Sequence, residues 1–104
     1  MNKPVLSVLV LISNIRAAAD FDLMFRDMGY ASGSGTTEKD AYFYLEHFEV
    51  RVLFVEAENF SEFIKSARRQ FPALHIVLYR QPHTNTTLLD SYIQDEVVGP
   101  TSSS

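Results

Sequence analysis

Several polar side chains come directly after strongly apolar runs, at points where strands are expected to end. Ser13 follows the first such run, Glu56 the second and Arg80 the third. In open α/β sheets, ligands bind in the crevice beyond the carboxyl ends of the strands. One interpretation of these three residues is therefore a site for a small molecule or nucleotide.

A glycine- and serine-rich stretch from Gly33 to Thr37 precedes a helical pattern. Main-chain N–H groups in such a stretch can hold a phosphate group at a helix N-terminus. The stretch lacks the spacing of a P-loop or of a dinucleotide-binding fingerprint, and no suitably placed Lys follows it. It also follows a helical pattern rather than a clear strand. We therefore predict a flexible loop here.

Metal and nucleophile chemistry have little support in the sequence. His47, His75 and His83 fall in a predicted helix, strand and loop, without the i, i+4 spacing of a helical metal site. The sequence has no Cys, which excludes a disulfide scaffold, a thiol nucleophile and thiolate metal ligands. We expect no metal, no cofactor and no enzymatic activity.

Composition indicates one small globular domain. The chain has 104 residues, of which 46% are hydrophobic, and its net charge is −4. The negative charge argues against direct nucleic-acid binding, because phosphate contacts need clustered Lys and Arg. The only adjacent basic pair, Arg68–Arg69, falls in a predicted helix and is expected to face solvent. The apolar run Val5–Ile12 is too short to span a bilayer, and no signal-peptide pattern is evident, so we predict a cytoplasmic protein.

The hydrophobic pattern alternates between two types of segment. Continuous apolar runs are typical of strands buried on both faces of a parallel sheet, and amphipathic segments between them are typical of helices. This alternation predicts a doubly wound, parallel, five-stranded α/β sheet with right-handed crossovers. The expected strands are Val5–Ile12, a weak edge strand within 31–36, Val50–Val55, Leu74–Tyr79 and a short one at Val97–Val98; the expected helices are Ile15–Met28, Glu38–Phe48, Phe60–Phe71 and Thr87–Asp95.

Two helices carry patterns that predict which residues are buried. In the first helix, an apolar stripe runs from Ile15 to Met28 and is expected to face the sheet. In the second, Tyr42, Phe43 and Tyr44 are consecutive, and helix neighbours are about 100° apart. At least one of these three rings is therefore expected at the surface.

The order, spacing and length of these elements resemble the receiver domain of bacterial response regulators, from Val5 to Pro100. The first helix ends in Gly29-Tyr30, the Val50–Glu56 segment resembles the strand that leads to the phospho-acceptor, and Phe71–Leu78 resembles the link from the third helix to the fourth strand. The resemblance implies a flavodoxin-like (CheY-like) fold with strand order 2-1-3-4-5. It assigns residues 1–100 to the domain and 101–104 to a disordered tail or linker.

The resemblance also identifies a degenerate phospho-acceptor pocket. Receivers use two acids after the first strand, an acceptor Asp after the third, a Thr or Ser after the fourth and a Lys before a Pro after the fifth, so that Mg²⁺ and Lys neutralise the phosphoryl charge. One Glu with a Ser and an Asn makes a poor Mg²⁺ site, and Glu is one methylene longer than Asp. The matching residues here are Ser13, Asn14, Glu56, Tyr79 or Arg80, Gly99 and Pro100.

Glu56 permits two interpretations within this resemblance. A longer carboxylate can imitate a phosphorylated Asp and hold an active state. The alternative, which we favour, is a partly exposed strand-end acid without that role, because the Lys and hydroxyl that would bind the mimic are missing.

The resemblance implies a non-phosphorylatable pseudo-receiver, a protein-interaction or dimerisation module in bacterial signal transduction or transcription regulation. The alternative remains a flavodoxin-like domain that binds a small molecule or nucleotide. Receivers usually end in a fifth helix, and the sequence shows no helical stripe after Pro100. We expect the apolar strip left there to bind a partner or a second copy, unless the fourth helix fills it or the chain continues beyond Ser104. The fourth-helix residues concerned are Leu88, Leu89, Tyr92 and Ile93.

Overall fold

The computed structural model describes residues 3–80, in which strands and helices alternate. The predicted alternation is confirmed through the fourth strand, with small shifts at the boundaries. The predicted fourth helix, fifth strand and tail lie outside the described residues. The strands are β1 (Val5–Leu11), β2 (Ser32–Gly35), β3 (Glu49–Glu56) and β4 (His75–Tyr79), and the helices are α1 (Ile15–Asp27), α2 (Glu38–His47) and α3 (Ser61–Gln70).

The four described strands form one parallel sheet in the order β2-β1-β3-β4. This matches the first four positions of the expected 2-1-3-4-5 order. Leu9 of β1 lies opposite Leu53 of β3, and Leu53 lies opposite Ile76 of β4. Both central strands, β1 and β3, contribute buried residues to the two faces of the sheet, as the position of a central strand requires.

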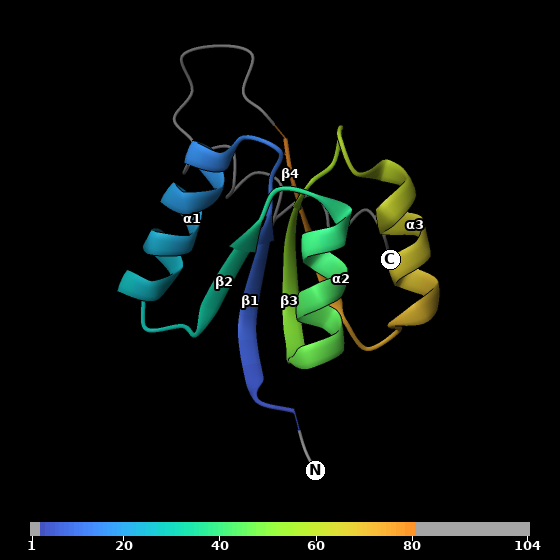
Figure 1. Cartoon of the computed structure of the whole chain (residues 1–104), viewed down its shortest axis with the longest axis horizontal. Helices are drawn as coiled ribbons and strands as arrows, with labels where there is room; N and C mark the ends of the chain where they lie inside the picture. Colours follow the sequence, from blue (N-terminus) through green and yellow to red (C-terminus); the bar gives the residue numbers. More distant parts are fainter. Residues whose placement is uncertain (1–2, 81–104) are drawn as a thin grey trace.

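Helices cover both faces of this sheet, α1 on one side and α2 with α3 on the other (Figure 1). Alternate residues of β1 divide between the two cores: Val8 and Val10 pack on the α1 side, and Leu9 and Leu11 on the α2–α3 side. On the α1 side, the rings of Phe21, Phe54 and Tyr79 pack together with centroids 4.8 to 5.6 Å apart.

The prediction for the stripe on α1 is only partly correct. Ala18, Phe21 and Phe25 are buried against the sheet, but Ile15 is 77% exposed and Met28 is 58% exposed. These two residues are at the ends of the helix, beyond the stretch that packs on the strands. On α2 the expected surface ring is Phe43, which is 53% exposed, while its neighbours are half-buried.

Ser32–Gly35 forms the edge strand β2, so the weak edge strand predicted within 31–36 is confirmed and the flexible loop predicted for Gly33–Thr37 is wrong over Gly33–Gly35. Its glycines allow α2 to approach the sheet closely. A Cβ added at Gly33 would lie 2.9 Å from Cε1 of Tyr44, and one added at Gly35 would lie 2.6 Å from Cβ of Asp40. Both distances are shorter than normal contacts, so the small residues at this edge are a packing requirement.

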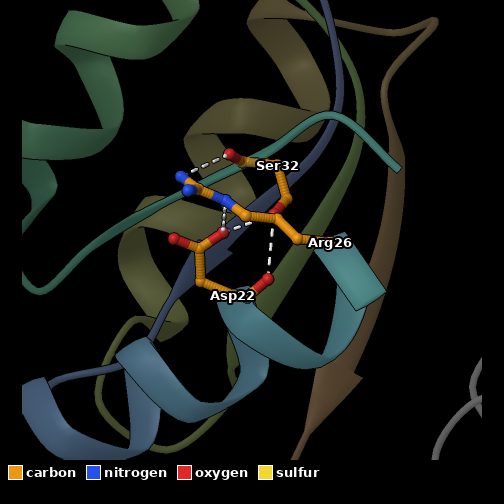
Figure 2. Close-up of polar contacts among 3 residues, drawn as sticks. All are labelled: Asp22, Arg26 and Ser32. Atoms are coloured by element: carbon orange, nitrogen blue, oxygen red, sulfur yellow. Dashed lines mark hydrogen bonds and ion pairs between the residues drawn. The ribbon is translucent and has the colours of Figure 1, made fainter. Parts of the chain in front are cut away.

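Polar contacts from α1 also hold the edge strand (Figure 2). The Ser32 hydroxyl bonds to the Asp22 carboxylate and lies 3.1 Å from the Asp22 carbonyl oxygen. The Arg26 guanidinium donates to the same carboxylate and to the Ser32 carbonyl oxygen, both at 3.2 Å. The side chains of Asp22 and Arg26 therefore join one helix to a strand that has little apolar surface of its own.

The packing at β2 predicts the effect of one added methyl group. Gly35→Ala should lower the free energy of unfolding by about 1–3 kcal/mol, because the new Cβ forces α2 away from the strand. Urea denaturation measures this loss. Ser34→Ala, at the half-buried neighbouring position, is the matched control and should change stability far less. Equal stability of Gly35→Ala and the wild type would contradict the close approach of α2.

Candidate functional site

The candidate site lies where β1 and β3 end side by side. Leu11 and Val55 are paired in the sheet, so Ser13 and Glu56 follow adjacent positions. Oε1 of Glu56 accepts hydrogen bonds from the Ser13 main-chain N–H at 2.9 Å and from the Ser13 hydroxyl at 2.8 Å. The structure thus brings together two of the residues that the sequence had identified.

A third residue completes this group. The Asn59 amide donates to the Ser13 hydroxyl oxygen at 3.0 Å, so the hydroxyl accepts from Asn59 and gives its own hydrogen to Glu56. Sequence reasoning missed Asn59, and the only available signal was a polar side chain in the segment between β3 and α3. We call Ser13, Glu56 and Asn59 the Glu56 cluster.

Glu56 is only 3% exposed, so the expectation of a partly exposed acid is wrong. A buried carboxylate is unfavourable unless hydrogen bonds compensate for the water that it loses. Here the donors on Ser13 provide that compensation at the end of β3, directly after three buried residues, Leu53, Phe54 and Val55.

The hydrogen bonds also decide the charge of Glu56. Burial raises the pKa of its carboxyl, but hydrogen bonds from Asn59 and from Ser13 act in the opposite direction and outweigh it. The net result is a pKa below the ordinary value of 4.5. Glu56 is therefore an ionised, buried carboxylate at neutral pH, and the donors that hold it are neutral groups.

The other predicted pocket residues do not join this cluster. Asn14 caps α1 instead, with its side-chain oxygen accepting from the Ala17 N–H at 3.0 Å. Tyr79 lies opposite Glu56 in the sheet, but its ring is buried on the α1 side against Phe21. Arg80 follows at the surface. Gly99 and Pro100, and the predicted interface residues Leu88, Leu89, Tyr92 and Ile93, lie outside the described residues.

The N-terminus of α2 already holds a carboxylate of its own. Asp40 accepts from the Thr36 N–H at 3.0 Å, and the Thr37 hydroxyl accepts from the Asp40 N–H at 3.2 Å. The main-chain hydrogen bond from Thr36 is the main reason why the pKa of Asp40 is below its ordinary value of 3.8. This reciprocal capping occupies the position that a phosphate group would need.

The histidines lie apart in the described part of the chain. His47 contacts the Phe43 carbonyl oxygen at 2.8 Å near the end of α2, and His75 is exposed at the start of β4; His83 lies outside the described residues. Within residues 3–80, no group of three or more His, Asp or Glu side chains could hold a metal ion. No helix in the same range is long and apolar enough to cross a membrane.

Two hollows in the described region lie toward the opposite end of the strands. The larger, about 860 Å³, lies among the end of α2, the start of β3 and the turn before β4. The smaller, about 340 Å³, lies on the α1 side beside Phe25, Val52 and Val77. Neither hollow is lined by the Glu56 cluster, so the expected ligand crevice beyond the strand ends receives no support from them.

Comparison with known proteins supports the fold. No protein-family model matches this chain. No curated protein sequence matches it either. The structure is similar to that of a response regulator from Thermotoga maritima, with a TM-score of 0.66 and 16% sequence identity over 89% of this chain and 76% of the other. At this identity the likeness shows the α/β receiver fold and carries no residue roles.

The lowered pKa of Glu56 predicts a pH dependence of stability. A carboxyl whose pKa is lower in the folded state stabilises the protein above its ordinary pKa, and this contribution disappears as the pH falls through the folded-state value. Glu56→Gln should therefore lower the free energy of unfolding at neutral pH by about 1–3 kcal/mol and flatten its decline below about pH 5. Urea titrations at several pH values test this.

A matched control separates the Glu56 cluster from general charge effects. Glu58 is an exposed acid two residues further on. Glu58→Gln should keep the wild-type stability and acid profile. If both variants gave the same profile as the wild type, the Glu56 cluster would have no role in stability.

Proposed function

We propose that this chain is a receiver-like protein-interaction module in signal transduction that does not carry a phosphoryl group. The fold, shared with a response regulator, supports the receiver-like part of this proposal. The engagement of Glu56 by Ser13 supports the non-phosphorylatable part. Bacterial signalling and transcription regulation are the settings in which such a module would act.

The state of Glu56 is the observation on which the proposal depends. A carboxylate that attacks a phosphorus atom must present a free oxygen to an approaching donor. Oε1 of Glu56 is already bonded to two donors on Ser13, and the residue is 3% exposed. Because the residue is buried, neither carboxylate oxygen can reach a phosphoryl donor unless the end of the strand opens.

The partners of Glu56 are also unsuited to a divalent ion. Mg²⁺ prefers an octahedral set of oxygens, commonly one or two carboxylates with water molecules. Ser13 contributes an N–H and a hydroxyl hydrogen toward Glu56, which offset its negative charge instead of adding to it. In this proposal Glu56 is a structural tie between the ends of β1 and β3, and it does not imitate a phosphorylated Asp.

A small-molecule or nucleotide site has less support. The two described hollows lie away from Ser13 and Glu56, and the α2 N-terminus is occupied by Asp40. Within residues 3–80, an interaction surface is therefore better supported than a small-molecule site.

Exposure to a phosphoryl donor tests this proposal directly. Incubation with Mg²⁺ and acetyl phosphate should leave the intact mass of the protein unchanged, because the acceptor oxygen is buried and bonded. Phosphorylation would add about 80 Da, the mass of one HPO₃ group. A phosphorylatable receiver treated in parallel verifies the reagent. A stoichiometric adduct on the wild type that is absent from Glu56→Ala would overturn the proposal.

A further inference from the structure

The outward side of α1 carries an apolar stripe that the sheet does not use. Ile15 is 77% exposed and Leu23 is 60% exposed, and Ala19 between them is exposed as well. A spacing of four residues places all three side chains on one face of the helix. The outward face of a surface helix is normally polar, so an apolar stripe at this place indicates a surface that binds a partner.

Two charged residues beside the stripe are not among the ion pairs of the described part of the chain. Arg16 and Asp20 lie side by side next to the stripe, and both are exposed. Their spacing would permit an ion pair, but in residues 3–80 the ion pairs are Arg26–Asp22, Arg51–Glu49 and Lys65–Glu62. The border therefore presents one positive and one negative group to whatever covers the stripe.

We propose that a second copy of this chain covers the stripe, with the two α1 helices antiparallel about a twofold axis at Ala19. Residues equally distant from Ala19 then meet, so Ile15 of each copy contacts Leu23 of the other. Ala19 has the smallest side chain of the three, and its position at the axis lets the two helices approach closely. The stripe is thus complementary to itself, as a twofold interface requires.

The charges select this antiparallel arrangement. Arg16 lies three residues before Ala19 in the sequence. In the antiparallel pair it is therefore level with residue 22 of the second copy, three residues after that copy's Ala19. Asp20 of that copy is two residues away, an offset of about 3 Å along the helix. The twofold axis repeats this pair, which gives two Arg16–Asp20 contacts. In a parallel pairing, with the twofold axis along the helices, Arg16 of one copy and Asp20 of the other would instead lie on opposite sides of the stripe and could not pair.

The proposal deepens the proposed interaction function and rests on it. One pair of helices buries less surface than a stable dimer needs, so the association should be weak and transient. With such an interface, the local concentration of the module decides whether it is a monomer or a dimer. The predicted fourth-helix interface does not enter this proposal, because those residues lie outside the described chain.

A charge exchange between copies gives the decisive test. Arg16→Asp places acids against Asp20 of the second copy, and Asp20→Arg places bases against Arg16. Sedimentation velocity over a range reaching millimolar concentration should show self-association of the wild type. Each variant alone should self-associate about tenfold more weakly or less. An equimolar mixture of the two should regain the wild-type association, because both contacts then join opposite charges.

Apolar substitutions provide the matched control. Leu23→Glu should abolish self-association, whereas Phe43→Glu, at an exposed apolar position on α2, should leave it unchanged. Circular dichroism verifies that all variants remain folded. A wild type that stays monomeric, or a variant mixture that fails to recover association, would overturn the α1 interface. A dimer broken by Phe43→Glu and not by Leu23→Glu would overturn it too, but would leave the proposed interaction function intact.

Discussion

β1 and β3 pair in parallel from Val5–Glu49 to Leu11–Val55, and each strand must be covered on both faces. α1 supplies one cover and α2 with α3 the other, so the positions of all three helices follow from this pairing (Figure 1). The same pairing brings the ends of the two strands together. Ser13 and Glu56 meet because the register pairs Leu11 with Val55, shortly before each strand ends.

Burial of Glu56 links the fold to its proposed role. An ionised side chain within the protein is tolerated only when donors replace its water. Ser13 supplies two donors, and Asn59 orients the hydroxyl of Ser13. This bonding supports the proposal that Glu56 joins the ends of β1 and β3 and does not accept a phosphoryl group.

Helix α1 packs against the core of the sheet and also contacts the edge strand β2. Its inner face fills the core through Phe21 and Phe25, and its C-terminal half holds the edge strand through Asp22 and Arg26 (Figure 2). The outward residues Ile15 and Leu23 contribute to neither task. Their exposure shows that the helix carries more apolar surface than packing on the sheet requires.

Strands and helices with a local signal could be predicted from the order of the amino acids. Apolar runs at Val5–Ile12 and Val50–Val55 identified the central strands, and the amphipathic segments Ile15–Met28 and Glu38–Phe48 identified the first two helices. These patterns succeed because burial of a strand or of one helix face acts on residues that are close in the sequence. Receiver-like strand order followed from the resemblance and holds for the four described strands.

Features that join residues distant in the sequence became visible only in the folded protein. Glu56 is buried because Ser13, 43 residues away, provides its donors, and Asn59 acts on Ser13 across 46 residues. Gly33 and Gly35 resembled a loop because the reason for their small size, the close approach of Tyr44 and Asp40 on α2, appears only after the helix packs on the sheet. The exposure of Ile15 was equally hidden, since periodicity shows which residues share a helix face but not where the sheet beneath that face ends.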